Sequence, residues 1–105
     1  MIILAIDSGF ERTGYAILKN DKSVVSYKTS GLIKTSSKHS MPKRLEEIFI
    51  KLDQIIKKEK PTAIAMEQIF FFKNQKTVIP VAQAQGVALL LAAQHNIELE
   101  FLTPL

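Results

Sequence analysis

The sequence contains no cysteine, so disulfide bonds and thiolate metal sites are both excluded. It has no apolar run long enough to span a bilayer, and its first residues lack the basic segment and cleavage site of a signal peptide. It also has no Walker loop, zinc-ligand spacing or Ser-His-Asp set. The two histidines, His39 and His95, have no evident partner and are expected at the surface. These absences favour a cytoplasmic protein whose metal ligands, where it uses them, are oxygen atoms.

The 105 residues, 47% of them hydrophobic, suffice for one small domain with a modest core. All fourteen Lys and Arg residues lie at or before Lys76, together with eight of the ten acidic residues. Residues 1–76 therefore carry a net charge of +6, whereas residues 77–105 carry −2. A basic body beside a nearly uncharged end suits a polyanionic partner on one side and a covered surface on the other. The lysines could equally serve only to keep a small domain soluble.

The first third of the sequence predicts three antiparallel strands. Residues 2–6 form an unbroken apolar run rich in branched side chains, which is typical of a strand buried on both faces. Gly9 and Gly14 permit a tight turn into a second strand over residues 13–19. A polar hairpin turn then leads into a returning strand over residues 23–33.

Two helices alternate with two further strands in the rest of the sequence. Ser40 and Pro42 predict a helix start, and Pro61 predicts its end. Apolar residues recur at helical spacing between these limits, and charged residues, Arg44 among them, occupy the other face. The remaining elements are expected at residues 62–67 (strand), 77–95 (helix, with Thr77 as a cap and Pro80 in its first turn) and 97–101 (strand). The predicted order is β-β-β-α-β-α-β.

Two of the short apolar strands end in a carboxylate, namely Asp7 and Glu67. A right-handed crossover through the intervening helix would make these strands parallel neighbours, so the two carboxylates should lie side by side. Like charges at adjacent strand ends repel each other, and a divalent cation between them would offset that repulsion. The alternative is that Asp7 is only a turn residue that accepts backbone hydrogen bonds.

Three consecutive phenylalanines, residues 70–72, are followed by Lys73, Asn74 and Lys76. A single strand or helix cannot bury all three rings in one core, so at least one should be exposed or lie under a loop. Aromatic rings beside cations and a carboxylate pair suit stacking on unpaired bases, with the lysines on phosphates. The alternative is that two rings are buried and the third lies in an interface.

The helix expected over residues 77–95 carries no charge from Thr77 through Gln94. Ala82, Gly86 and Ala93 share one side of it, and Val87, Leu90 and Leu91 widen that side. A helix that is apolar nearly all round is either fully buried or shared with a partner. A homodimer built on this helix and simple burial against the sheet are therefore both open.

Strand-end carboxylates, a basic body and an exposed aromatic indicate metal-dependent phosphodiester hydrolysis, in which divalent ions clamp the attacking water and the leaving oxygen. In combination, four motifs resemble the Holliday-junction resolvase family RuvC. They are Ile6-Asp7-Ser8-Gly9 with Thr13-Gly14-Tyr15, Pro42-x-Arg44-Leu45, Met66-Glu67-Gln68-Ile69-Phe70-Phe71-x-Lys73-Asn74, and Gln83-Ala84-x-Gly86-Val87-Ala88.

The resemblance implies a single ribonuclease-H-like α/β domain over residues 1–105, with a five-stranded mixed sheet. It implies a Mg²⁺-dependent (or Mn²⁺-dependent) homodimeric endonuclease that nicks four-way DNA junctions in recombination and repair, with a branch-migration helicase as a partner. Asp7 and Glu67 match two of the family's four catalytic, metal-binding acids, and Phe70 matches the aromatic that stacks on a junction base. The accompanying candidates are Arg12, Lys73, Asn74 and Lys76 for DNA, and Ala82, Gly86, Leu90 and Ala93 for the dimer interface.

The sequence departs from the family pattern at Ala5, Ser8 and Gln85, where glycine, proline and arginine are usual; the last change could weaken DNA contacts or a helix-end interaction. The family's other two acidic ligands lie on a C-terminal helix beyond residue 105. The resemblance therefore predicts a truncated domain that lacks this helix and is weakly active or inactive, since Glu98 and Glu100 are poor substitutes.

Two other functions stay open from the sequence. One is a non-catalytic nucleic-acid-binding module with the same fold. The other is an actin-like ATPase lobe, because Asp7-x-Gly9 followed by Gly14 also fits a phosphate-binding turn. The second ranks lower, since such ATPases are much longer and need a second lobe.

Overall fold

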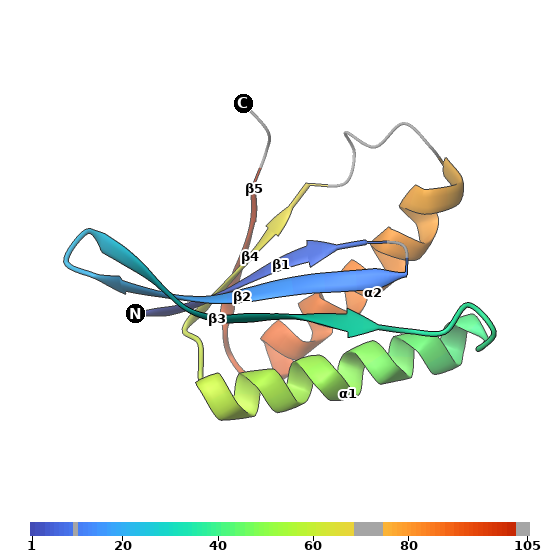
Figure 1. Cartoon of the computed structure of the whole chain (residues 1–105), viewed down its shortest axis with the longest axis horizontal. Helices are drawn as coiled ribbons and strands as arrows, with labels where there is room; N and C mark the ends of the chain where they lie inside the picture. The colour runs from blue at the N-terminus through green and yellow to red at the C-terminus, as the bar shows by residue number, and fades with distance from the viewer. Residues whose placement is uncertain (10, 69–74, 103–105) are drawn as a thin grey trace.

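The computed structural model describes residues 1–9, 11–68 and 75–102 of the chain. Five strands form one mixed sheet in the order β3-β2-β1-β4-β5 (Figure 1). An antiparallel meander consists of β1 (Ile2–Ser8), β2 (Arg12–Asp21) and β3 (Val24–Lys34). The strands β4 (Ala63–Glu67) and β5 (Glu98–Leu102) run parallel to β1. The predicted element order and the parallel pairing of the first and fourth strands are both confirmed.

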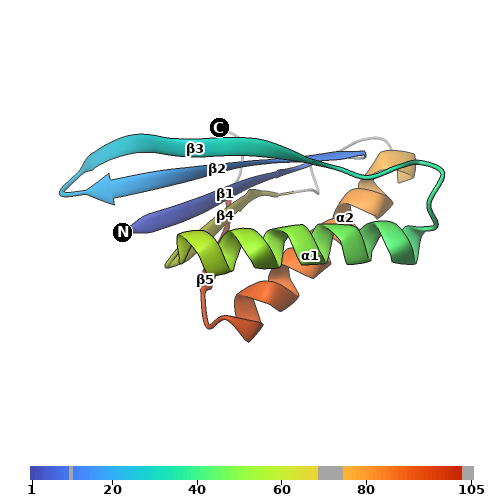
Figure 2. The same cartoon turned by 60° about the horizontal axis from the view of Figure 1, so that its bottom comes forward.

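The two helices, α1 (Met41–Glu59) and α2 (Gln75–Gln94), both lie on the same face of the sheet (Figure 2). Alternate residues of the central strands point into the layer between sheet and helices, where Leu4, Ile64 and Met66 are at most 1% exposed. The helices contribute Leu52 and Leu91, which are equally buried. Each such side chain stabilises the fold by about 1.5–3 kcal/mol relative to exposure. Within the described residues, neither helix combines the length and apolarity that crossing a membrane requires.

The single-sided placement of the helices corrects one expectation about β1. Leu4 and Ile6 are buried beneath the helices, but Ile3 and Ala5 are only half-buried and Asp7 is exposed. The strand is therefore covered on one face rather than on both. The helix-free face is the one on which the first carboxylate lies.

The ends of α1 agree with the sequence in position but not in every contact. Ser40 occupies the N-cap position, yet its hydroxyl makes no capping hydrogen bond. At the other end Lys60 adopts a left-handed conformation (φ 53°, ψ 54°), and its N–H donates to the Ile56 carbonyl at 2.8 Å. Arg44 is buried (7% exposed) and does not belong to the charged face, because its side chain reaches back toward Thr35.

The second helix begins at Gln75, two residues before the predicted start. Thr77 and Pro80 consequently lie inside the helix, and neither has the capping or first-turn role that the sequence suggests. Pro80 removes one backbone donor but does not end the helix. Packing of its buried side, which includes Val81 and Ala88, offsets that loss.

Candidate active site on the helix-free face of the sheet

Asp7 and Glu67 lie at the carboxyl ends of the two central parallel strands. The register pairs Ile6 of β1 with Met66 of β4, so the next residues along, Asp7 and Glu67, are neighbours across a strand spacing of about 4.8 Å. Ile6 and Met66 are buried beneath the helices, and alternation along a strand therefore turns Asp7 and Glu67 to the opposite face. Both carboxylates are exposed and line the same pocket. The predicted juxtaposition of the two acids is confirmed.

The pocket around the two carboxylates has a volume of about 450 Å³ and lies on the helix-free face. Small residues make up much of its lining, including Ala5, Gly14, Ala16 and Ala65. A side chain at Gly14 would contact the Cβ atom of Asp7 at 3.8 Å. Only small side chains therefore project from the sheet beside the acids, so a bulky substrate backbone can approach them closely.

The donor set of the pocket fits a hard divalent cation. Carboxylate oxygens are ligands that Mg²⁺ and Mn²⁺ prefer. Neither Asp7 nor Glu67 takes part in an ion pair with another described residue. Over residues 1–9, 11–68 and 75–102 there is no group of three or more potential metal ligands. The described part of the chain therefore supplies two ligands, and one cation between them would relieve their mutual repulsion.

The other acids on this face lie on β5. Its register pairs Glu100 with Ala65 and Glu98 with Ala63, while Leu99 packs against the core. Glu98 and Glu100 therefore project to the same face as Glu67; Glu100 lies two residues behind the level of Glu67, and Glu98 lies four residues behind it. They do not complete a metal-binding group with the two central acids.

Gln85, which the sequence reasoning named only as a departure from the family pattern, supports the site in a way that it did not predict. It lies on the buried side of α2, is 5% exposed, and donates a hydrogen bond from Nε2 to the Glu67 carbonyl oxygen at 2.9 Å. On the other side, the Gln68 N–H donates to the Leu102 carbonyl at 2.8 Å. These bonds fix the end of β4, where Glu67 projects. The available signal was the position of Gln85 as a lone polar residue among Ala84, Ala88 and Leu91 on the buried helix side.

The turn after Asp7 is equally constrained. A side chain at Gly9 would run into the Arg12 carbonyl oxygen, so only glycine fits that close approach. Ser8 pairs with Thr13, and both are buried. Arg12 itself is exposed at the start of β2, close to this turn. The strand end that carries Asp7 is therefore paired with β2 and flanked by buried residues.

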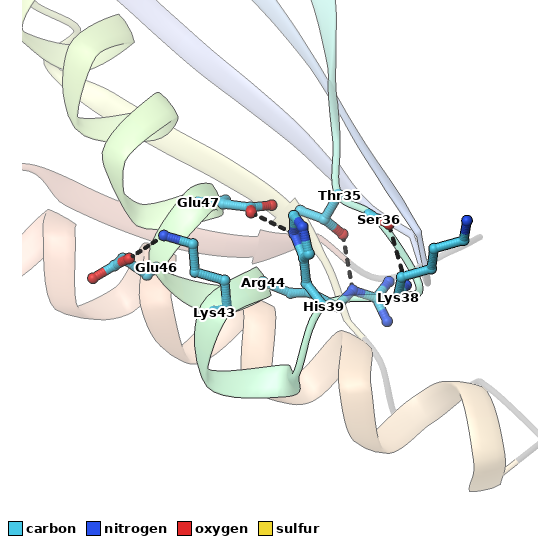
Figure 3. A network of polar contacts seen from close by, with 8 residues as sticks. All are labelled: Thr35, Ser36, Lys38, His39, Lys43, Arg44, Glu46 and Glu47. Carbon is cyan, nitrogen blue, oxygen red and sulfur yellow. Dashed lines mark hydrogen bonds and ion pairs between the residues drawn. The ribbon is translucent and has the colours of Figure 1, made fainter.

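A polar network anchors the loop between β3 and α1 (Figure 3). Arg44 donates from Nε to the Thr35 hydroxyl at 3.0 Å. His39 and Glu47 form a contact of 2.7 Å between Nδ1 and Oε1. His39 thus has a carboxylate partner, contrary to the sequence expectation, and that partner belongs to the helix rather than to the candidate site.

His95 also has a partner that the sequence did not reveal. Its Nε2 lies 2.7 Å from Oδ1 of Asp53, and the Lys57 ammonium lies 2.9 Å from the other oxygen of the same carboxylate. Lys57 first and His95 second hold the pKa of Asp53 below its ordinary value. This cluster joins the end of α2 to α1 and lies apart from the pocket of Asp7 and Glu67. Neither histidine is therefore a ligand of that pocket.

Most of the predicted DNA contacts cannot be compared with the structure. Phe70, Lys73 and Asn74 lie outside the described residues, and so does the side chain of Lys76. Arg12 is described and exposed. Their role in binding DNA stays a prediction.

The two sides of α2 differ sharply in burial. Ala84, Ala88 and Leu91 are buried against the sheet. The residues of the predicted dimer interface lie on the outer side, where Gly86, Leu90 and Ala93 are exposed and Ala82 is half-buried. Leu90 is 52% exposed. Burial against the sheet thus accounts for one side of the helix and leaves the other side apolar and uncovered by described residues.

Comparisons with known proteins agree on one family. A family model described as crossover junction endodeoxyribonuclease RuvC matches residues 3–105. A protein of that name from Fusobacterium nucleatum is 45% identical over 105 residues, which are all of this chain and 55% of the relative. Another from Alkaliphilus metalliredigens is 46% identical over 108 residues, which cover all of this chain and 64% of the relative. The chain thus spans somewhat more than half the length of these relatives.

Among solved structures, "T. thermophilus RuvC in complex with Holliday junction substrate" superposes with a TM-score of 0.90 at 20% identity. The match covers 99% of this chain and 66% of that one. This likeness confirms the ribonuclease-H-like fold. The comparisons do not favour the non-catalytic module or the ATPase lobe.

Proposed function

The chain belongs to the RuvC family of crossover junction endodeoxyribonucleases, and on that premise we propose that it nicks four-way DNA junctions by metal-assisted phosphodiester hydrolysis. Such an activity would serve DNA recombination and repair. The observation that carries the proposal is the pair of exposed carboxylates, Asp7 and Glu67, at the ends of adjacent parallel strands in one pocket. The contacts around these two unpaired acids do not give them a structural role.

In this proposal Asp7 and Glu67 hold a divalent cation, Mg²⁺ by preference and Mn²⁺ as an alternative. Divalent ions in such hydrolysis polarise the phosphate and activate the attacking water. The other residues of the site do not bind the cation but hold the two acids in place or leave room beside them. Gln85 fixes the backbone of Glu67, and the small residues around Asp7 let a phosphodiester backbone come close. Two carboxylates hold a divalent ion weakly, so we expect binding on the order of millimolar.

The proposed substrate is branched DNA, and the proposed assembly is a homodimer. Phe70 would stack on a junction base, and Arg12, Lys73, Asn74 and Lys76 would contact phosphates or sugars. The dimer would pair the outer sides of two α2 helices, since apolar residues such as Leu90 are exposed there. A branch-migration helicase is proposed as a further partner on family grounds.

Metal binding and cleavage test the proposal with one set of variants. We expect Mn²⁺ to broaden the amide NMR signals nearest to Asp7 and Glu67 first, and Asp7→Asn or Glu67→Gln to weaken this effect at least tenfold. Glu100→Gln is the matched control, because it removes an acid from the same face outside the pair. Any slow nicking of a labelled four-way junction should need Mg²⁺ or Mn²⁺ and both acids.

Two outcomes would count against the nuclease proposal. One is that Asp7→Asn and Glu67→Gln bind Mn²⁺ as well as the wild-type chain does. The other is salt-sensitive junction binding by a wild-type chain that binds no Mn²⁺ at the two acids, which would fit the non-catalytic module.

A further inference from the structure

A groove of about 400 Å³ lies between β3 and α1. It is on the helix-covered side of the sheet, so the sheet itself separates it from Asp7 and Glu67. Figure 1 shows α1 running beside the edge strand β3, and residues of both elements line the groove. Tyr15 and Ile33 contribute to its sheet side, and Gln54 and Ile55 to its helix side.

Basic side chains surround this groove from both elements. Lys34 comes from β3, and Lys51 and Lys58 come from α1; all three are exposed. Glu59, the acidic residue among those that line the groove, is neutralised by Lys28 at 2.8 Å, and its side chain is only 8% exposed. The groove therefore presents three positive charges and almost no accessible negative charge.

The three lysines belong, with Lys19, Lys22, Lys38 and Lys60, to the described lysines that form no ion pair with another described residue. Lys28, Lys43 and Lys57 each bind a carboxylate. In contrast, none of Lys34, Lys51 and Lys58 is engaged in an ion pair within the part of the chain that the structure describes. Their ammonium groups are available to a ligand from outside.

The spacing of these charges fits a phosphate backbone. Lys51 and Lys58 are seven residues apart on one side of α1, which corresponds to about 10.5 Å along the helix axis. Phosphates of one strand rise by about 3.4 Å each along the duplex axis and also turn around it, so this distance suits phosphates about one or two steps apart. Lys34 is a lining residue from β3, and Tyr15 and Thr29 add hydroxyl-bearing residues to the lining.

We propose that this groove is a second nucleic-acid site, which binds the sugar-phosphate backbone of a DNA duplex without reading its sequence. The inference rests on the proposed function for the choice of DNA as ligand. It adds a contact for a duplex arm that leaves the carboxylate face and passes around the edge strand β3. Binding there needs no metal, because the lysines themselves neutralise the phosphates.

The test compares two triple variants that remove the same charge. The first is Lys34→Gln, Lys51→Gln and Lys58→Gln, which removes the three lysine charges from the lining of the groove. The control is Lys19→Gln, Lys22→Gln and Lys38→Gln, which removes three exposed lysines away from it. Binding to a labelled plain duplex is measured by fluorescence anisotropy in EDTA at several salt concentrations.

The groove variant should lower the slope of log K against log salt by about 2–3, since each lost phosphate contact is worth about 0.9. At 0.1 M salt it should bind at least tenfold more weakly than the control variant. On the wild-type chain, duplex DNA should shift the amide NMR signals of Thr29, Lys34 and Gln54, a readout that does not depend on how the variants fold.

Equal loss in both triple variants, or the absence of any duplex binding by the wild type, would overturn the groove proposal. So would tighter binding of poly-glutamate of matched charge than of duplex DNA at the same salt concentration, which would indicate an acidic protein partner instead. The nuclease proposal is judged separately, by metal-dependent nicking and its loss in Asp7→Asn. A groove variant that nicks as slowly as the wild type but binds duplex poorly would support both proposals.

Discussion

Replacing Gln85 with methionine should loosen the strand end that carries Glu67. The side chain keeps its length and burial, but the donor to the Glu67 carbonyl at 2.9 Å is lost. A net hydrogen bond contributes about 0.5–1.5 kcal/mol, and a buried group left without its partner costs about 1–3 kcal/mol. The added apolar surface of methionine offsets part of this, so we expect a loss of about 1–2 kcal/mol in the free energy of unfolding.

Urea denaturation monitored by circular dichroism measures this loss. For a domain of this size, each kcal/mol corresponds to about 4–8 °C in Tm. Gln94→Met is the matched control, because Gln94 lies on the same helix, is exposed, and should change stability by less than about 0.5 kcal/mol.

A second readout separates local positioning from general stability. If Gln85 fixes the backbone of Glu67, Gln85→Met should also weaken Mn²⁺ binding several-fold under conditions where the variant is fully folded. Gln94→Met should leave Mn²⁺ binding unchanged. The reasoning fails if Gln85→Met matches Gln94→Met in both stability and Mn²⁺ affinity.

Two further predictions concern the packing of the helices. Leu52→Ala should destabilise the chain by about 2–5 kcal/mol, because this side chain is 1% exposed between sheet and helices and its removal leaves a cavity. Urea denaturation measures the loss, and a value below about 1 kcal/mol would mean that neighbouring side chains fill the cavity. Lys57 and His95 lower the pKa of Asp53, so the ionised carboxylate stabilises the fold above its ordinary titration range near pH 4, and that contribution is lost as the pH falls through the lowered pKa. Asp53→Asn should therefore be less stable than the wild type at pH 7 and approach it near pH 3, and an unchanged difference between these two pH values would contradict the ion-pair account.

The pairing of Asp7 with Glu67 was predictable because it depends on local patterns and one general rule. Each acid ends a short apolar run, and the helical spacing of apolar residues predicts the helix between the two runs. The right-handed crossover then makes the strands parallel neighbours. The observed register of Ile6 with Met66 follows from this without any knowledge of the rest of the fold.

Other features depend on which elements meet in space, and the sequence could not specify them. That both helices cover one face leaves Asp7 exposed on the other, and it places Gln85 beneath Glu67. Arg44 lies four residues before Ile48 on the buried side of α1, and its partner Thr35 comes from the β3–α1 loop. The partner of His95 is 42 residues away along the chain.

The amino-acid sequence by itself determined the order of strands and helices, the central parallel pair and the two acids at its end, because hydrophobic periodicity and chain handedness act over short distances. Only the tertiary structure decided which face of the sheet stays open, which polar side chains support the acids, and which lysines gather around a groove. Those properties depend on how elements such as β3 and α1 pack against each other. Side-chain periodicity within one element does not specify that packing.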